Sequence, residues 1–211
     1  MDETFDSLLR QAPELAPCMP NLEQAFRLLR RAFRQGGKLL VCGNGGSAAD
    51  AEHIVGELMK GFERRRALPR AEREHLQTLY PREGRYLADH LQGALPAISL
   101  VSQTSLLTAV ANDTAADMVF AQQVYGYGRP GDVLMAISTS GNSPNVLHAL
   151  RVARAASLLT MGLTGPHGGE MVALCDVVVE VPQDGMAEVQ RAHQALYHAL
   201  CQQLEEEFFA P

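Results

Sequence analysis

Two segments of this sequence carry side chains that could transfer a proton or bind a metal. His53 and Glu57 stand four residues apart in a stretch of helical character, so they share one face. Such an imidazole–carboxylate pair could shuttle a proton near neutral pH, although a plain surface contact explains it equally well. Near the C terminus, Gln190, Gln194 and His198 line up at four-residue spacing. Histidine and glutamate suit a transition metal but glutamine is an unusual ligand, so spacing alone does not define a metal site.

Two polar turns could bind the anionic group of a substrate. The first, Gly43-Asn44-Gly45-Gly46-Ser47, follows the apolar run 38–42 and leads into a helix. Glycines allow a sharp turn with exposed amides, and a helix N terminus carries unpaired N–H groups and a partial positive charge. This turn therefore predicts an anion site, most naturally for a phosphate, at the end of a strand.

The second turn, Ser138-Thr139-Ser140-Gly141-Asn142-Ser143, follows the apolar run 132–137. Its hydroxyl groups supply several hydrogen-bond donors for a phosphate. Ser143 before Pro144 could instead be a helix cap, with proline at the first helical position. A cap accounts for one serine and leaves the other hydroxyl residues unexplained. Two such turns in one domain therefore favour phosphate binding.

A dinucleotide is the competing ligand for the first turn, because Gly43, Gly45 and Ala48 satisfy a loose Rossmann fingerprint. That fingerprint expects an acidic residue at the end of the next strand, where it binds the ribose hydroxyls. Here the next strand ends in residues 99–102, Ser-Leu-Val-Ser, which carry no carboxylate. The sequence therefore argues against a nicotinamide cofactor.

The elements that must position these residues alternate between apolar strands and amphipathic helices, which predicts a parallel sheet covered on both faces. The expected strands are residues 38–43, 96–101, 132–137, 158–163 and 176–181. The expected helices are residues 21–35, 47–61, 104–111, 115–127, 144–156, 168–174 and 186–208. Such a chain forms an α/β three-layer sandwich of the doubly wound, flavodoxin-like type, whose ligands gather at the carboxyl ends of the strands.

Residues 63–93 interrupt this alternation with a highly charged stretch between the first crossover helix and the second strand. The segment is predicted to be an inserted helical pair or a long arm, and a solvated charged face is its simplest role. A lid over a site or an oligomer contact is the alternative. The whole chain, residues 1–211, is expected to form one domain that carries this insertion.

The composition is that of a globular protein, with 211 residues of which 46% are apolar and 20% charged. The net charge of −6 argues against direct binding of nucleic acid. No apolar stretch approaches the roughly 18 residues of a membrane span, and the acidic N terminus lacks the features of a signal peptide. The scattered cysteines are expected to be buried free thiols of a cytoplasmic protein: Cys18, Cys42, Cys175 and Cys201.

The motifs CGNGGSAADAEH, ISTSGNS, LTGPHGG and a late Q-x-x-H-x-x-x-x-H together resemble the sugar isomerase (SIS) domain family, specifically its phosphoheptose isomerase type. The resemblance covers about residues 20–62 and 94–208 and leaves residues 63–93 unmatched. It implies a five-stranded parallel α/β sandwich. It also implies a homo-oligomer, a tetramer with active sites at its subunit interfaces.

The resemblance also implies roles for individual positions. Glu57 corresponds to the general base and His198 to its acid/base partner. The positions that bind zinc in metal-containing members correspond to His53, Glu57, Gln190 and His198. The positions that correspond to substrate-binding residues are Asn44, Gly45, Gly46, Ser47, Asp113, Ser138, Thr139, Ser140, Ser143 and Gln190.

The reaction implied by the resemblance converts sedoheptulose 7-phosphate to D-glycero-D-manno-heptose 7-phosphate. A ketose–aldose conversion moves a proton between C1 and C2 through an enediol(ate), so it needs a base and a second group at the adjacent oxygen. A remote phosphate anchor holds the reacting carbons in place. Zinc, where bound, would polarise the carbonyl or hold Glu57 and His198 in position.

Two positions depart from the family pattern. Gly61 stands where the family commonly has an arginine, with Lys60 beside it. Ala187 stands where an aspartate that helps bind substrate is expected, with Glu188 one position out of register. These departures leave an isomerase of another ketose phosphate as one alternative function.

A second alternative is a non-catalytic SIS-domain protein that binds a replication initiator or senses a sugar phosphate. Relatives of that type resemble this chain in both polar turns but lack the acid/base pair. Because Glu57 and His198 are both present, the enzyme is favoured over the binding protein.

Overall fold

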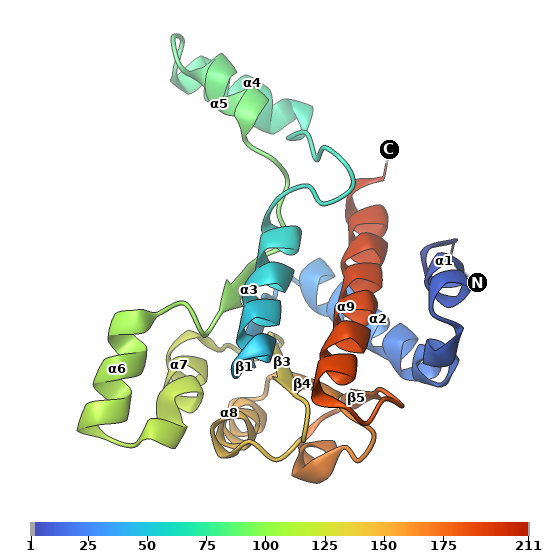
Figure 1. The fold of residues 1–211 in the computed structure, drawn as a ribbon. Coiled ribbons are helices and arrows are strands. Elements are labelled where there is room, and N and C mark those ends of the chain that lie inside the picture. The colour runs from blue at the N-terminus through green and yellow to red at the C-terminus, as the bar shows by residue number, and fades with distance from the viewer. Residues whose placement is uncertain (1–2, 211) are drawn as a thin grey trace.

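The computed structural model describes residues 3–210 and contains a five-stranded parallel sheet (Figure 1). Its strands are β1 (Leu39–Gly43), β2 (Ala97–Ser99), β3 (Val133–Ser138), β4 (Leu159–Thr164) and β5 (Val177–Glu180). The order across the sheet is β2-β1-β3-β4-β5, and every neighbouring pair is parallel. Strand β2 lies on one side of β1, and β3, β4 and β5 follow on the other side, so the order of the strands reverses at β1 and β3. The carboxyl ends of these two strands therefore border the crevice in which doubly wound sheets bind their ligands.

The strands are buried on both faces because their side chains feed two separate hydrophobic cores. Leu39 and Val41 pack into one core, and Leu40 and Cys42 pack into the other. Every residue of β1 is buried, which explains why this strand is a continuous apolar run instead of an alternating pattern.

Helices cover each face of the sheet, as the alternating pattern predicts. One face carries α1 (Glu3–Gln11), α2 (Met19–Arg34), α3 (Gly46–Met59) and α9 (Met186–Phe209). The other face carries α7 (Val119–Tyr127) and α8 (Pro144–Ala155), with α6 (Thr104–Asp113) packed against α7. The described chain also has 3-10 helices at Pro13–Cys18, Ala116–Met118 and Gly169–Leu174. Helices α3 and α9 lie side by side, so the two histidine-bearing segments meet (Figure 1).

The expected α/β sandwich is confirmed, but several elements differ from the expected ones. The helix expected at 115–127 is a 3-10 helix at Ala116–Met118 followed by α7. Strand β2 is short because it is an edge strand that pairs with β1 alone, and the chain turns away after Ser99. The helix expected at 168–174 is a 3-10 helix. The sequence pattern gave no indication of α1, whose Phe5 packs edge-on against Phe26 of α2 with ring centroids 6.3 Å apart.

The charged segment 63–93 contains two helices, α4 (Arg70–Leu79) and α5 (Gly84–His90). They pack on each other and project as an arm from the body of the domain (Figure 1). No residue of α4 is buried, and α5 buries only Gly84 and Ala88. The predicted helical pair is present, and its role as an insertion stays a prediction.

Within residues 3–210, none of the helices combines the length and the apolar character that crossing a membrane requires.

Candidate active site

The first polar turn joins β1 to α3 and depends on two glycines. Gly45 has φ of 55° and ψ of −120° and immediately precedes the first residue of α3. This backbone conformation is one that glycine adopts readily and other residues do not. A Cβ at Gly46 would clash with the side-chain amide of Gln190, so this glycine lets the α9 side chain approach the turn.

The second polar turn, between β3 and α8, holds two hydroxyl groups against each other. Oγ of Ser138 lies 3.1 Å from Oγ of Ser143, and Ser138 is buried. Ser143 precedes α8 but its side chain makes no capping hydrogen bond, so a capping role does not explain this serine. Gly141 has φ of 64°, and a Cβ there would clash with the backbone of Gly168 in the loop after β4.

A reciprocal amide pair ties the two turns together. Nδ2 of Asn44 donates to Oδ1 of Asn145 over 2.9 Å, and Nδ2 of Asn145 donates to Oδ1 of Asn44 over 2.9 Å. Sequence reasoning missed Asn145, because its partner lies 101 residues away and no short motif contains both. The pair holds the two turns together at the carboxyl ends of β1 and β3.

The two turns and the start of α9 enclose a small cavity of about 220 Å³. Its walls are Asn44, Gly45, Gly46, Ser47, Ile137, Ser138, Thr139, Ser143, Met186 and Gln190. A second cavity of about 400 Å³ lies between α3 and α9 and shares Gly46 and Gln190 with the first. Its other walls are Ala49, Asp50, His53, Ala187, Arg191, Gln194 and Tyr197. A ligand with its anionic group in the first cavity can thus extend along α3 into the second.

The acid/base candidates meet where α3 packs against α9. Nε2 of His53 lies 3.0 Å from Oε1 of Glu57, and the Glu57 side chain is largely buried. The His198 ring stands edge-on to the His53 ring with centroids 4.9 Å apart. Nε2 of His198 is buried and has no hydrogen-bond partner among the described residues. Burial and the neighbouring His53 lower the pKa of His198, which keeps its imidazole neutral at neutral pH.

Tyr197 contacts His53 on the side of the ring away from Glu57, and Asp50 contacts Tyr197. The sequence analysis identified neither residue. The Tyr197 hydroxyl donates to Oδ1 of Asp50 over 3.2 Å and lies 3.0 Å from Nδ1 of His53. Since the hydroxyl has one proton, Nδ1 of His53 must donate to it when Asp50 accepts. Nε2 of His53 then faces Glu57 as an acceptor, so their contact requires a shared proton or a cation. Burial raises the pKa of Asp50 and of Tyr197.

Other predicted site residues lie away from these two cavities. Glu57 and His198 lie beyond His53 and line neither cavity. Asp113, at the end of α6, accepts a hydrogen bond from Nδ2 of Asn112 over 2.7 Å and also lines neither. Ser140 lies on the outer side of its turn, in a separate hollow. The roles of Asp113 and Ser140 in binding substrate therefore stay predictions.

The expected zinc ligands are only partly brought together. His53, Glu57 and His198 form one cluster, whereas Gln190 lies against Gly46 at the far end of the second cavity. Across residues 3–210, no three His, Cys, Asp or Glu side chains are already arranged to hold a metal ion. The histidine and glutamate donors suit zinc, whereas glutamine is an unusual ligand for it.

Gly61 is required by the loop that follows α3. A Cβ at this position would clash with the backbone of Arg64, and its N–H donates to Oε1 of Gln92 over 3.0 Å. An arginine therefore cannot occupy position 61 in this loop conformation. Lys60 provides a positive charge instead, with Nζ 3.5 Å from Oε2 of Glu57.

The neighbouring Glu188 does not replace the aspartate expected at position 187. Ala187 faces the second cavity, whereas Glu188 lines a different hollow and pairs with Arg191 over 3.7 Å. A shift of one position on a helix turns the side chain by about 100°. The second cavity consequently lacks a carboxylate on this turn of α9.

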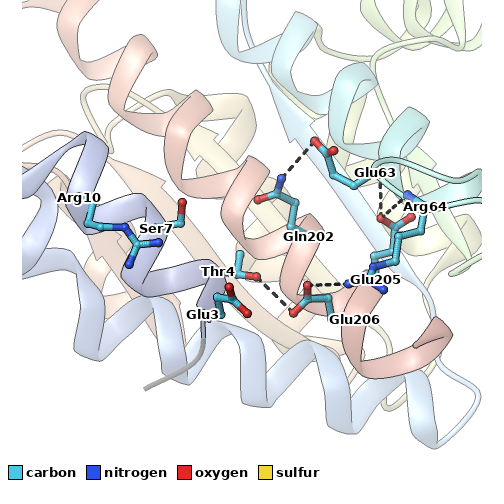
Figure 2. A pocket seen from close by; sticks show the side chains of 9 residues that line it. All are labelled: Glu3, Thr4, Ser7, Arg10, Glu63, Arg64, Gln202, Glu205 and Glu206. Atoms are coloured by element: carbon cyan, nitrogen blue, oxygen red, sulfur yellow. Dashed lines mark hydrogen bonds and ion pairs between the residues drawn. The ribbon is translucent and has the colours of Figure 1, made fainter. Parts of the chain in front are cut away.

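A third, polar cavity of about 460 Å³ lies at the far end of α9, between α1 and the loop after α3 (Figure 2). Its lining residues are Glu3, Thr4, Ser7, Arg10, Glu63, Arg64, Gln202, Glu205 and Glu206. None of the residues that the sequence singled out for chemistry lines it, and Arg64 pairs with Glu206 across it over 3.3 Å.

Comparison with known proteins agrees with this geometry. The family model described as the SIS domain matches residues 6–86 and 75–165. A phosphoheptose isomerase of Rhodospirillum rubrum is 41% identical over 91% of this chain and 88% of its own. One of Thiobacillus denitrificans is 43% identical over 86% of this chain and 81% of its own. The chain belongs to the phosphoheptose isomerase family. The solved phosphoheptose isomerase of Neisseria gonorrhoeae has a TM-score of 0.74 at 34% identity, covering 96% of this chain and 95% of its own.

Membership of the phosphoheptose isomerase family confirms the enzyme class, an aldose–ketose isomerase, and the fold that the motifs predicted. The two matched ranges of the family model together run through residues 63–93.

Proposed function

We propose that this chain interconverts sedoheptulose 7-phosphate and D-glycero-D-manno-heptose 7-phosphate. The observation that carries the proposal is the placement of Glu57 and His198 at one end of the α3–α9 contact, with both polar turns at the other end.

The phosphate binds in the smaller cavity, between the two turns. The N terminus of α3 offers backbone N–H groups and the positive end of the helix dipole. Ser138 and Ser143 supply hydroxyl groups that are already held 3.1 Å apart. Gln190 closes the cavity on the side of α9. The phosphate takes no part in bond changes, so this site supplies binding energy and orientation.

The proton transfer takes place at the α3–α9 end of the site. The Glu57 carboxylate removes a proton from C1 of the ketose and returns it to C2, forming and consuming an enediolate. The neutral His198 imidazole passes a proton between the oxygens on C1 and C2, so that no proton is gained or lost overall. Asp50 and Tyr197 hold His53, which in turn contacts Glu57.

We also propose that His53, Glu57, Gln190 and His198 bind zinc. When bound, the ion would polarise the carbonyl oxygen of the sugar. Elemental analysis of protein purified without chelator tests this directly. The proposal is supported if the wild type contains zinc and the His53→Ala variant does not. A wild type that contains no zinc would overturn it.

The active form is proposed to be a homotetramer in the cytoplasm. Asp113 lies outside both cavities and the α4–α5 arm has little contact with the domain, which suits a site completed by a second subunit. The cysteines are free, and Cys18, Cys42 and Cys201 are buried, as expected of a protein in a reducing compartment.

In the deciding experiment, the protein is incubated in deuterated water with ketose phosphates of five, six and seven carbons. Proton exchange at C1 and C2 of each sugar is then measured. The expected result is exchange and net isomerisation with sedoheptulose 7-phosphate. Activity only with a shorter ketose phosphate would favour another isomerase, and the missing carboxylate at Ala187 is the feature that would explain it. Absence of exchange with every sugar would leave a sugar-phosphate-binding protein.

A further inference from the structure

The last turn of α3 is held by a buried arginine that comes from outside the helix. Glu57 lies in this turn, and helix C termini leave carbonyl groups without intrahelical partners. Arg66 reaches back to these groups: its guanidinium donates to the carbonyl oxygen of Glu57 over 2.8 Å and to that of Leu58 over 2.7 Å. Arg66 is only 2% exposed, so these are desolvated, charge-assisted hydrogen bonds.

Glu205 of α9 fixes the other side of Arg66. Its Oε1 accepts from Nε of Arg66 over 2.7 Å and from the backbone N–H of Phe62 over 2.8 Å. Its Oε2 accepts from the backbone N–H of Glu63 over 2.8 Å and of Arg64 over 3.1 Å. Figure 2 shows Glu205 on α9 pointing at this loop. Both oxygens of the Glu205 carboxylate thus accept two hydrogen bonds each, from Arg66 and from the backbone of residues 62–64.

The protonation of Glu205 agrees with this geometry. Burial acts to raise the pKa of Glu205, but hydrogen bonds from the Phe62 backbone and from Arg66 outweigh it and leave the pKa below its usual range. The carboxylate is therefore charged at neutral pH and the pair is a true ion pair. The Phe209 ring covers the guanidinium at 4.6 Å, which further excludes water.

A buried ion pair of this kind is an inefficient way to stabilise a fold, because an apolar pair of similar volume often does as well or better. Its effect here is geometric. Arg66 binds the carbonyl of Glu57 itself, and Glu205 lies on the same helix as His198, seven residues later. The chain of contacts therefore sets the position of the last turn of α3 relative to α9.

We propose that Arg66 and Glu205 are positioning residues that set the Glu57 carboxylate against His198 for proton transfer. The inference rests on the proposed isomerase function. The pair is remote from the phosphate-binding turns and lines neither of the two cavities beside them. Loss of the pair should consequently lower the rate of proton transfer without weakening the binding of the sugar phosphate.

The test compares Arg66→Lys and Glu205→Gln with a matched control, Asp132→Asn. Lysine keeps the charge but loses the planar fork that reaches both carbonyls. Asp132 is equally buried, at 3% exposed, and likewise accepts from a basic side chain, Lys38, and from backbone N–H groups. It lies at the amino end of β3, whereas the polar turns lie at the carboxyl ends of the strands, so its loss should affect stability alone.

All variants are assayed at a temperature at which circular dichroism shows them folded. The expected result is a kcat at least tenfold lower in Arg66→Lys and Glu205→Gln, with KM within twofold of the wild type, and unchanged kcat in Asp132→Asn. Equal kcat in all four proteins would overturn the inference. So would a loss of kcat that also appears in Asp132→Asn at the same loss of stability.

Crystal structures of the same variants supply a measurement that does not depend on turnover. Glu57 should shift relative to His198 in Arg66→Lys and stay in place in Asp132→Asn. An unmoved Glu57 would refute the positioning role even if the wild type proved inactive. Inactivity of the wild type toward all sugar phosphates would refute the proposed function instead.

Discussion

At the scale of single residues, the site depends on a small number of contacts between α3 and α9. His53 contacts Glu57 at 3.0 Å on one side and Tyr197 at 3.0 Å on the other. Nε2 of His198 is buried and has no hydrogen-bond partner within residues 3–210. These contacts agree with the proposal that Glu57 and His198 transfer the proton and that the residues around them orient the pair.

Substitution of the acid/base pair should abolish isomerisation while the fold stays intact. Glu57→Gln and His198→Ala are each expected to lower kcat by at least about a hundredfold, the usual contribution of a positioned acid or base. The matched controls are Glu52→Gln, an exposed glutamate of α3, and His148→Ala, a half-exposed histidine of α8. Near-normal turnover in either site variant would refute the assignment.

The sequence identified the candidate site residues that belong to short motifs, and it missed the candidates that are defined by distant contacts. Glu57, Ser138 and Gln190 stand in recognisable local patterns. Asn145, Tyr197 and Arg66 matter only because the fold brings them to partners 101, 144 and 9 residues away, respectively. Even the nearest of these, Arg66, lies in a charged run that gives no sign of burial.

At the scale of elements, the sequence predicted what periodicity and glycine turns encode. The central strands were predicted because burial on both faces makes them continuous apolar runs. The edge strand β2 is shorter than its apolar run, since only one neighbour pairs with it. Helix α1 is nine residues long and would be marginal alone, so its stability comes from tertiary packing that no local pattern shows.

Two glycines in the polar turns should respond differently to alanine, because their neighbours differ. At Gly46 the added Cβ meets the flexible end of the Gln190 side chain, which can move aside. Gly46→Ala should therefore keep near wild-type stability and raise KM severalfold by displacing Gln190. At Gly141 the Cβ meets the backbone of Gly168, and φ is already positive.

Gly141→Ala should consequently destabilise the fold by more than about 1 kcal/mol. Urea unfolding and steady-state kinetics on both variants separate the two effects. The exposed glycine Gly126 in α7, with nothing near its Cβ, is the control, and Gly126→Ala should change neither quantity adversely. Equal loss of stability in Gly46→Ala and Gly141→Ala would contradict this account.

At the scale of the whole molecule, stability should fall on mild acidification because of a buried histidine in α9. His193 is completely buried, and burial lowers its pKa from the usual 6.5. Below pH 6.5 the unfolded chain therefore takes up a proton that the folded chain refuses, so stability is full above this pH and decreases as pH falls toward the folded pKa. Each tenfold preference for the neutral form corresponds to about 1.4 kcal/mol.

Urea unfolding of the wild type and of His193→Gln between pH 8 and pH 5.5 measures this dependence. The wild type should lose free energy of unfolding more steeply than the variant as the pH falls. Because His198 also has a lowered pKa, some dependence of the same sign should remain in His193→Gln. Parallel curves for the two proteins would show that His193 is protonated equally in both states.

The arm formed by α4 and α5 predicts how the whole molecule assembles. It exposes several apolar side chains: Leu79, Tyr80, Tyr86 and Leu91 are 50% to 65% exposed. Exposed apolar side chains gathered on one projection mark a protein contact. In light scattering the wild type should have four times the 22.9 kDa mass of the chain. Leu79→Ser with Tyr86→Ser should give a smaller assembly with lower turnover, because the proposed site is completed between subunits.

The control for this experiment is Glu72→Ser, which changes the exposed polar surface of α4 and should keep both mass and turnover. A monomeric wild type with full activity would refute the proposed assembly. If the double variant kept the wild-type mass, the arm would not be the contact. An assembly that dissociates without loss of turnover would show that one subunit contains the complete site. In that case Glu57 and His198 would have to reach the sugar from within their own subunit, although they lie beyond His53 and line neither of the two cavities.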